Sequence, residues 1–385
     1  MNIRSCVLKS VIPAKSAQPQ KITPVDQMVA EEGLFALSPA QVESVRREFV
    51  RQAAQWHLQS GSSYAAYASR QGFRMDMLAT ADGVGALPLL PSMLFKREAL
   101  RLAHPAATDI LWTTSSGTKG SISRIPRDDI TLRRFFASIG NLSNEMLDIQ
   151  NSDITVFNLG PDADEANNLW ISYVMAGITV MLPKSRYYVQ ANRLLLEDLI
   201  HDLQATLGQR IALMGPPPLL ADLAHALVAR RIRLQPRPDS LVVTIGGWKR
   251  RSGERMPRAA FDELLAGVFQ LPSSQVRDTF NMVELNSVLV ECEHKLLHVP
   301  PWLYVRARDP GSLGVLPGGH SGVLSYLDPT ARSFPCFVLS DDLGSVDENY
   351  KCACGRCSDV LRIERRLNTV ESRGCALKMD SFVRN

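Results

Sequence analysis

The stretch TTSSGTKGS, from Thr113 to Ser121, combines hydroxyl, glycine and lysine residues directly after a short apolar run. Glycines let backbone N–H groups converge on one point, hydroxyls add further donors, and the lysine supplies a positive charge. Such a segment can surround an anion, and phosphate is the obvious candidate. The same composition also suits a solvated turn between two elements, so composition alone leaves both interpretations open.

A second group of chemically versatile residues is the run CACGRC, which contains Cys352, Cys354 and Cys357. Their spacing is typical of zinc ligands, but a structural zinc site needs four ligands and only three are present locally. Three reduced thiols beside a turn at Gly355 are the alternative. Four residues elsewhere in the sequence are candidates for the fourth ligand: Cys292, His294, His298 and Cys336.

The composition bounds the class of protein. The chain has 385 residues, of which 45% are hydrophobic and 21% charged, as in an ordinary globular protein of two or three structural units. Its formal net charge is only +4 and its lysines and arginines are scattered, which argues against nucleic-acid binding. The N-terminal segment lacks the apolar core of a secretion signal, and the longest apolar runs are too short to span a bilayer. Because the cysteine count of 7 is odd, a secreted disulfide framework is disfavoured, and we expect a cytoplasmic protein.

The elements that must position these residues follow an α/β pattern from Asp109 onward. Short apolar runs alternate with helical stretches such as LLLEDLIHDLQATLG and LLADLAHALVARR; the apolar runs are DILW, DITVFNLG, GITVMLP, RIALMGP and SLVVTIGG. This alternation predicts βαβ units and a mainly parallel sheet. Ligands of such sheets bind at the carboxyl ends of the strands. We expect TTSSGTKGS, GPPPLL and IGGWKRRSG to lie there and to face one cleft.

Changes in composition and in predicted secondary structure along the chain predict its domain organisation. A basic arm occupies residues 1–30, and an amphipathic helix begins after an N-cap at Ser38. The βαβ core is expected over 31–285. Shorter strand-like runs with Gly and Pro turns predict a smaller antiparallel β subdomain over 286–345. The remaining segment, 346–385, is too short for an ordinary independent domain.

The order of the motifs resembles that of the adenylate-forming superfamily of acyl- and aryl-activating enzymes. TTSSGTKGS resembles its phosphate loop, FNMVEL from Phe280 its aromatic-Gly-x-Thr-Glu motif, and SDDLG from Ser340 its Thr-Gly-Asp-Leu motif. Within the superfamily, the acyl-protein synthetase branch of bacterial bioluminescence operons is most similar, through LPLLPSMLFK, IGGWKRRSGE, HVPPWLYVRARDP and ESRGC. The resemblance spans roughly 34–379. Phenazine-pathway adenylating enzymes belong to the same neighbourhood, so a fatty acid and an aromatic acid are both open as substrates.

The resemblance implies an enzyme that activates a carboxylic acid with ATP, forming an acyl-adenylate and releasing pyrophosphate. It implies that Glu284 ligates Mg²⁺, that Asp342 accepts hydrogen bonds from the ribose, and that Arg366 assists at ribose or phosphate. Glu284 as a surface carboxylate and Asp342 as part of a strand-ending turn are the alternatives. The residues implied to clasp the β- and γ-phosphates are Thr114, Ser115, Ser116, Gly117, Thr118 and Lys119.

Three departures from the superfamily pattern are visible. Asn281 replaces a glycine, Val283 a threonine, and Asp341 the glycine of Thr-Gly-Asp. The superfamily's mobile C-terminal domain, which carries a catalytic lysine, has no room before the last residue of the chain. Another cation must then take that role, and Lys249 is the candidate, although the basic triplet that it begins also suits a solvated face.

The fate of the activated acyl group is implied by the same resemblance. Cys375, in ESRGC, stands where acyl-protein synthetases are thought to carry a thioester, and a thiolate is a good acceptor for an acyl-adenylate. A lone cysteine can equally be a small apolar side chain, and direct transfer to a partner reductase would not need it. Three aromatic residues are candidates to line an acyl or aryl pocket, and the alternative is that they are ordinary core residues. They are Trp170, Tyr173 and Trp248. The rival to catalysis is a retired nucleotide-binding regulatory protein on the same scaffold.

Overall fold

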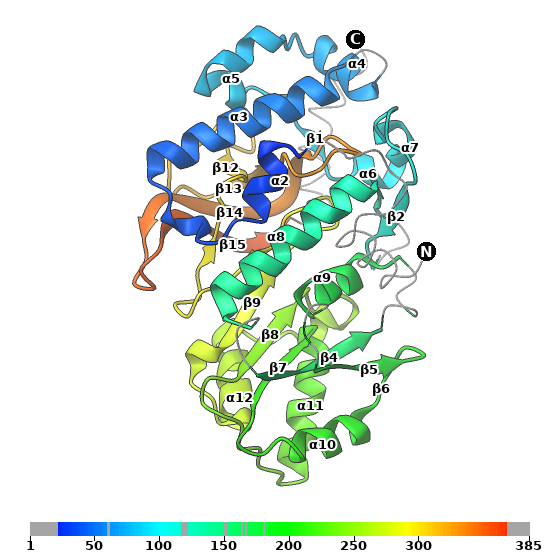
Figure 1. Cartoon of the computed structure of the whole chain (residues 1–385), viewed down its shortest axis with the longest axis vertical. Coiled ribbons are helices and arrows are strands. Elements are labelled where there is room, and N and C mark those ends of the chain that lie inside the picture. Colours follow the sequence, from blue (N-terminus) through cyan, green and yellow to red (C-terminus); the bar gives the residue numbers. More distant parts are fainter. Residues whose placement is uncertain are drawn as a thin grey trace.

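The computed structural model describes residues 22–59, 62–116, 122–149, 153–162, 165, 168–179, 182 and 184–367. Two large β-sheets form the two halves of the molecule, and helices pack around and between them (Figure 1). Among the described helices, none is long and apolar enough to cross a membrane.

The first sheet has seven strands in the order β10-β9-β8-β7-β4-β5-β6. The strands between its two edges run parallel, and the edge strands β10 and β6 pair antiparallel. The predicted mainly parallel βαβ arrangement is thereby confirmed. The strands are β4 (Ile154–Pro161), β5 (Ser185–Gln190), β6 (Arg193–Leu194), β7 (Arg210–Gly215), β8 (Leu241–Ile245), β9 (Val276–Phe280) and β10 (Leu289–Val290).

The two faces of this sheet are buried under different helices. Because side chains alternate along a strand, Ile211 and Leu213 of β7 face one apolar cluster, while Ala212 and Met214 face another. The first cluster is covered by α10 (Leu196–Gln204), α11 (Pro217–Ala229) and α12 (Arg258–Phe269). The second is covered by α8 (Asp129–Leu147) and α9 (Trp170–Thr179), which lie between the two sheets in Figure 1.

The segment GITVMLP, predicted as a strand, is not one where the structure describes it, because Gly177–Thr179 form the last turn of α9. A short apolar run cannot be assigned by periodicity when its element is buried on all sides, as this helix is. Gly177 is needed at the contact between α9 and α8. A Cβ there would lie 2.5 Å from Cγ2 of Ile139.

The second sheet is antiparallel and has the order β11-β15-β14-β13-β12, with β1 added parallel to β14. It contains the predicted β subdomain and continues past residue 345, since β14 and β15 extend it to Arg366. The strands are β1 (Leu90–Pro91), β11 (Leu297–His298), β12 (Tyr304–Arg308), β13 (Gly322–Leu327), β14 (Phe337–Lys351) and β15 (Cys357–Arg366).

N-terminal helices pack on this second sheet. The helix predicted after Ser38 is α3, and the Ser38 hydroxyl and the Gln41 side chain cap it reciprocally. Arg46 of α3 is buried and forms an ion pair with Asp359 of β15, at 2.6 Å between nitrogen and oxygen. The helices of this region are α2 (Pro24–Val29), α3 (Pro39–His57), α4 (Ser63–Arg70), α5 (Ala81–Gly85), α6 (Leu94–Arg97) and α7 (Ala99–Leu102); the short 3₁₀ turns are Leu34–Ala36 and Met75–Ala79.

The hydroxyl-rich stretch connects the strands of a separate hairpin, β2 (Leu111–Thr114) and β3 (Arg124–Arg127). The prediction that it follows a strand of the parallel sheet is therefore wrong. The strand before the stretch, β2, is short, alternates between buried and half-buried residues, and is not followed by a helix. These features are typical of a two-stranded hairpin, whereas a strand of a βαβ unit is followed by a helix. GPPPLL and IGGWKRRSG do follow strands of the parallel sheet, β7 and β8.

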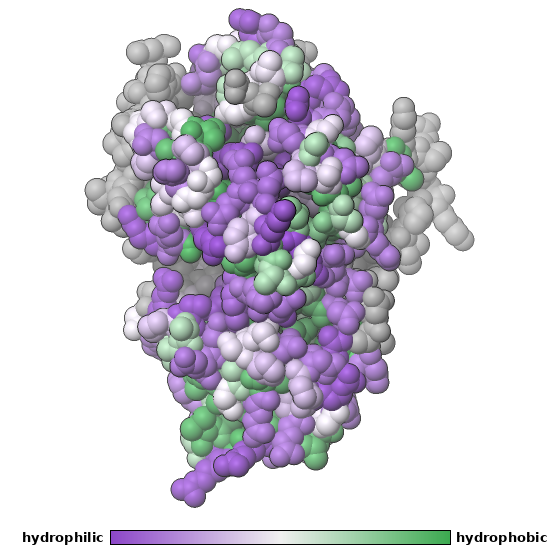
Figure 2. All heavy atoms as spheres, turned by 90° about the vertical axis from the view of Figure 1, so that its left-hand side faces the viewer, coloured by the Kyte–Doolittle hydropathy of each residue, from purple (hydrophilic) through white to green (hydrophobic). Residues whose placement is uncertain are grey.

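Large hydrophobic side chains are sparse on the described surface. Figure 2 shows hydrophilic residues over most of the visible face, with hydrophobic residues in small separate groups. The described large hydrophobic residues that are exposed are likewise scattered along the chain, from Ile22 to Tyr350.

Candidate active site

The base of the hydroxyl-rich hairpin is fixed by backbone and side-chain hydrogen bonds. The Ser115 amide donates to the Ser123 carbonyl, and the Ser123 amide donates to Ser115 Oγ, both at 3.1 Å. The Thr114 amide donates to the carbonyl of Asn168, just before α9, at 2.9 Å. The hairpin is thus anchored beside the parallel sheet, with Ser116 as the last described residue before its tip. The predicted phosphate ligands Gly117, Thr118 and Lys119 lie outside the described residues.

Glu284 lies in the connection between β9 and β10 and faces this hairpin. Its side chain is buried, with 5% of the residue exposed, so the alternative of a surface carboxylate is wrong. Ser123 Oγ donates a hydrogen bond to Glu284 Oε1 at 2.6 Å. Burial raises the pKa of Glu284, and the Ser123 hydrogen bond and the charges of Arg366 and Lys96 oppose the rise. The carboxylate is therefore held at the hairpin base, within range of two cations.

Arg127, at the end of β3, fixes the backbone on both sides of Glu284. Its Nη2 donates to the carbonyls of Val283 and Leu285, at 2.7 and 3.0 Å. Its guanidinium carbon lies 3.4 Å from the ring centroid of Trp170, so the ion is stacked as well as hydrogen-bonded. Burial lowers the pKa of Arg127 to about 9, which still leaves it charged at neutral pH. This arginine ties the hairpin to the segment that presents the carboxylate.

Asn281, which replaces a glycine of the superfamily motif, bridges two parts of the site. The Trp170 indole N–H donates to Asn281 Oδ1 at 2.6 Å, and Asn281 Nδ2 donates to the Ser287 carbonyl at 2.7 Å. Trp170 and Tyr173 are both buried and stack at 5.8 Å between ring centroids. Trp248 packs elsewhere, edge-on against Phe261 of α12. The three aromatic residues considered for one pocket therefore do not form one group.

Asp342 and Arg366 face each other across the β14–β15 ladder. Arg366 Nη2 lies 3.7 Å from Asp341 Oδ2, and Arg366 Nε lies 4.0 Å from Asp342 Oδ1. Burial raises the pKa of Asp342 to about 6; Arg366 opposes the rise, and the charges of Asp341 and Glu284 add to it. Both aspartates lie within β14, so the alternative that they end a strand is wrong. Glu284, Asp342 and Arg366 thus share one electrostatic environment, although they come from different sheets.

The sequence pattern of the acyl-protein synthetase family LuxE matches residues 15–383. The chain belongs to this family. It is 34% identical to the long-chain-fatty-acid–luciferin-component ligase of Aliivibrio fischeri over 345 residues, which is 89% of each chain. It is also 34% identical to the enzyme of that name from Vibrio harveyi over 341 residues, 86% of each chain. The predicted resemblance and the predicted class, an adenylate-forming ligase, are confirmed.

Solved structures with the same fold include those of 2-hydroxyisobutyryl-CoA ligase. The complex with 2-HIB-AMP and CoA in the thioesterification state matches with a TM-score of 0.70 at 16% identity, covering 92% of this chain and 74% of that one. An open conformation matches with a TM-score of 0.67 at 15% identity, covering 91% and 80%. At this level of identity the likeness establishes the fold, and it confirms the predicted fold class.

Four residues that contact the site or act on it through their charge were not predicted from the sequence. Ser123 follows the hydroxyl-rich stretch closely, and Ser92 and Lys96 lie within LPLLPSMLFK, a run quoted only for its family likeness. Ser92 Oγ donates to Asp341 Oδ2 at 3.0 Å, and Lys96 acts on Glu284 through its charge. Arg127 carried no signal beyond its proximity to the same stretch.

Lys249, the predicted replacement cation, begins the 3₁₀ turn Lys249–Glu254 after β8, and its side chain lies outside what the structure describes. Arg251 of the same triplet forms ion pairs with Asp222 and Glu254 at the surface. For Arg251, the solvated interpretation of the triplet is the correct one. Cys375, the predicted acyl acceptor, also lies outside the described residues.

Proposed function

We propose that this protein uses Mg²⁺-bound ATP to convert a long-chain fatty acid into an acyl-adenylate, with release of pyrophosphate. The observation that carries the proposal is the grouping of Glu284 with Asp342 and Arg366 beside the hydroxyl-rich hairpin. Two relatives at 34% identity are named long-chain-fatty-acid ligases. Related solved structures of the same fold hold 2-HIB-AMP.

In the proposed reaction, a carboxylate oxygen of the acid attacks the α-phosphorus of ATP, and the bond to the pyrophosphate oxygen breaks. The substrates are both anionic, so positioning and charge neutralisation are the main needs. Glu284 offers a buried carboxylate oxygen, the type of hard donor that suits Mg²⁺, which neutralises phosphate charge when bound. Arg366 and Lys96 are described cations near this point, and Lys249 remains a candidate for a third.

The remaining residues bind the nucleotide in this proposal. Asp342, as a carboxylate, accepts hydrogen bonds from the ribose hydroxyls, and its burial strengthens such bonds. The terminal phosphates bind to side-chain hydroxyls of Thr114, Ser115 and Ser116 at the described base of the hairpin and to Gly117, Thr118 and Lys119 beyond, because the amides of Thr114 and Ser115 already donate to the Asn168 and Ser123 carbonyls. Ser123 and Arg127 do not touch substrate and act as positioning residues for Glu284.

The class of acid is tested by ATP–pyrophosphate exchange with fatty acids from octanoate to stearate and with aromatic acids, including benzoate and phenazine-1-carboxylate. We expect kcat/KM to rise with chain length and to exceed the values for the aromatic acids. A preference for an aromatic acid would overturn the fatty-acid assignment while leaving adenylation intact. Nucleotide binding without exchange for any acid would instead support the retired regulatory protein.

For the second half of the reaction, we propose that the Cys375 thiolate attacks the acyl carbon, forming a thioester and releasing AMP. Replacing Cys375 with Ser is then expected to abolish the hydroxylamine-labile adduct formed from ATP, Mg²⁺ and labelled fatty acid, while pyrophosphate exchange continues. The matched control is Cys357→Ser, which should keep both activities. An adduct that persists in Cys375→Ser would exclude this acceptor. Exchange without any adduct in the wild type would point to direct transfer to a partner reductase.

A further inference from the structure

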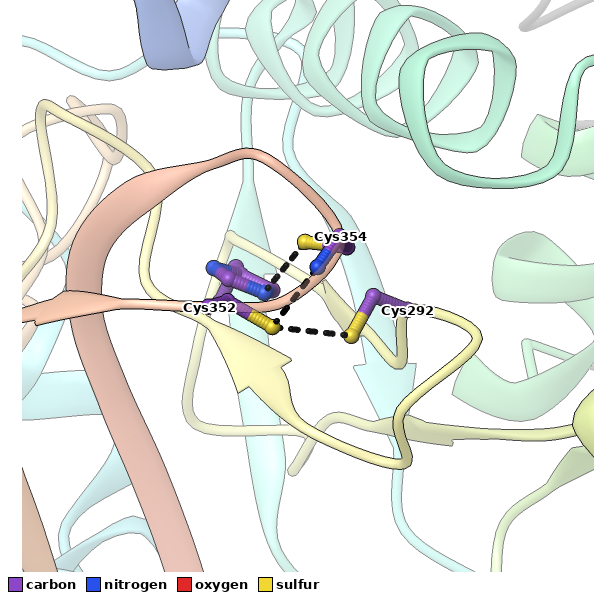
Figure 3. Close-up of side chains that lie close together, drawn as sticks. Cys292, Cys352 and Cys354 are labelled. Carbon is purple, nitrogen blue, oxygen red and sulfur yellow. Dashed lines mark hydrogen bonds between the residues drawn. The ribbon is translucent and has the colours of Figure 1, made fainter.

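Four potential metal ligands meet at a point away from the proposed active site. They are Cys292, which follows β10, His298 of β11, and Cys352 and Cys354 in the turn between β14 and β15. Figure 3 shows the side chains of the three cysteines close together. Cys292 Sγ lies 3.8 Å from Cys352 Sγ, and Cys354 Sγ lies 3.4 Å from His298 Nε2. All four ligand atoms lie within 4.8 Å of one another.

We propose that these four side chains bind a structural Zn²⁺ ion, as three thiolates and one imidazole. Tetrahedral zinc, with Zn–S of about 2.3 Å and Zn–N of about 2.0 Å, places two sulfurs about 3.8 Å apart and a sulfur and a nitrogen about 3.5 Å apart. The two measured separations agree with these values. The remaining sulfur–sulfur pairs need to close by no more than about 1 Å and the sulfur–nitrogen pairs by no more than about 1.3 Å, which side-chain rotation supplies.

The backbone around Cys292 forms a turn suited to a metal-bound thiolate. The Cys292 amide donates to the Leu296 carbonyl, and the Lys295 amide donates back to the Cys292 carbonyl, both at 3.0 Å. The turn is completed by a positive φ of 61° at Lys295. The amide of His294 donates to Cys292 Sγ at 3.4 Å. Such an N–H···S bond stabilises negative charge on the sulfur.

The turn around Cys352 repeats the same pattern on the facing hairpin. The Cys352 amide donates to the Arg356 carbonyl at 2.9 Å, and the Gly355 amide donates to the Cys352 carbonyl at 3.0 Å. Gly355 has φ of 88°, and the amide of Cys354 donates to Cys352 Sγ at 3.4 Å. Two equivalent turns thus present a cysteine at their first position to a common centre. This repetition is an observation independent of the side-chain distances.

The hydrogen bonds of His298 leave one ring nitrogen free to be a ligand. Its Nδ1 lies 2.7 Å from Ser358 Oγ, and that hydroxyl donates its only hydrogen to the Asp359 carbonyl at 3.0 Å. The hydroxyl must therefore accept from His298, so Nδ1 carries the proton. The lone pair of Nε2 then points toward Cys354 Sγ. A fixed tautomer of this kind is what a metal-binding histidine requires.

The ligand set differs from the one that the sequence predicts. Cys357, a predicted ligand, begins β15 and its Sγ contacts the Asn349 carbonyl at 3.6 Å, outside the cluster. Cys336 is remote from the cluster as well, since its Sγ donates to the Glu284 carbonyl at 3.1 Å. His294 contributes its backbone amide to the turn. The spacing within CACGRC could not exclude Cys357 as a ligand. Its exclusion depends on where β15 begins, because Cys357 belongs to this strand whereas Cys352 and Cys354 lie in the turn before it.

Four protein ligands close the coordination shell, so the ion has a structural role. Cys292 extends from β10, an edge of the parallel sheet, whereas the other ligands belong to the antiparallel sheet. The ion therefore joins the two sheets near their shared border. It sits at the turn of the β14–β15 hairpin, roughly 30 Å along the strands from Asp342, and takes no part in the proposed chemistry.

The test is metal analysis of the full chain purified without chelators. We expect about one zinc ion per chain in the wild type, release of it on titration of thiols with a mercurial reagent, and a fall in Tm of about 5 °C or more after its removal. Cys292→Ser and Cys352→Ser should lose the zinc, whereas the matched control Cys357→Ser should keep it. Wild-type protein without zinc after growth in zinc-supplemented medium, or equal loss in Cys357→Ser, would overturn the site.

A cobalt experiment on the wild type keeps the proposal testable if the serine variants do not fold. Co²⁺ in place of zinc should give the strong visible bands and thiolate-to-metal charge transfer of tetrahedral coordination by sulfur. The weak spectrum of octahedral Co²⁺ would contradict the proposal. So would a Cys292–Cys352 disulfide found by mass spectrometry in freshly purified protein.

Discussion

Replacing Glu284 with Gln is expected to lower Mg²⁺-dependent ATP–pyrophosphate exchange by about 100- to 1,000-fold, the usual cost of losing one well-placed electrostatic contact to the transition state. Gln keeps the volume of the side chain and an oxygen that can accept from Ser123 Oγ. It removes the charge and replaces one carboxylate oxygen, a possible Mg²⁺ ligand, with an NH₂ group. Because burial already disfavours that charge, the variant should fold as well as the wild type.

The measurement is an exchange assay over a range of Mg²⁺ concentrations, with Glu263→Gln as the matched control. Glu263 lies on the exposed face of α12, so the same chemical change there should leave the rate unaltered. For Glu284→Gln, the half-saturating Mg²⁺ concentration should rise as the maximal rate falls. An unchanged Mg²⁺ titration would rule out the proposed role of this carboxylate.

The second large effect is expected at Asp342. Asp342→Asn should raise KM for ATP by about 10- to 100-fold, because two hydrogen bonds to a charged acceptor are weakened. In the wild type, kcat/KM for ATP should fall as the pH drops through about 6, where Asp342 becomes protonated. In the variant, the fall of kcat/KM near pH 6, which is the acid limb of the pH profile, should disappear. The control is Asp347→Asn, also on β14, whose carboxylate pairs with Arg362 at the surface.

The pH dependence of folding stability separates the expected effect of Asp342→Asn on ATP binding from a loss of stability. The pKa of Asp342 is raised from 3.8 to about 6, so its contribution to stability is complete below pH 4 and is lost as the pH rises through about 6. At neutral pH the wild type therefore bears the cost of a buried charge that the variant lacks. Thermal unfolding at pH 7 should show Asp342→Asn to be at least as stable. An acid limb that persists unchanged in the variant would refute the assignment.

Much of the fold follows from local patterns. The apolar runs DITVFNLG, RIALMGP and SLVVTIGG are bounded by turns and separated by amphipathic helices, so β4, β7 and β8 could be predicted. The cap at Ser38 located the start of α3. Two predictions failed for physical reasons. The last turn of α9 was predicted as a strand because this helix is buried on all sides and has no periodic face. The stretch after β2 was placed at the parallel sheet because composition does not show that β2 pairs with β3 in a hairpin.

The candidate site likewise contains residues that local motifs predicted and residues that they could not predict. Motif likeness pointed to Glu284 and Asp342, and the structure brings them into one electrostatic environment. The residues that hold them, above all Arg127, act across more than 150 positions of sequence, and no local pattern encodes such contacts. The proposed zinc ligands show the same limit. CACGRC was visible in the sequence, but its partners Cys292 and His298 are brought to it only by the packing of two sheets.

The most direct test of the central claim is to identify the products of a single turnover. Cys375→Ser protein, which lacks the proposed acyl acceptor, in excess over ATP with Mg²⁺, a long-chain fatty acid and pyrophosphatase, should form the acyl-adenylate, detected by mass spectrometry, and two phosphates per ATP consumed. Omitting the acid or using Glu284→Gln should suppress both. Formation of ADP with one phosphate, or recovery of ATP unchanged despite binding, would contradict adenylate formation by this protein.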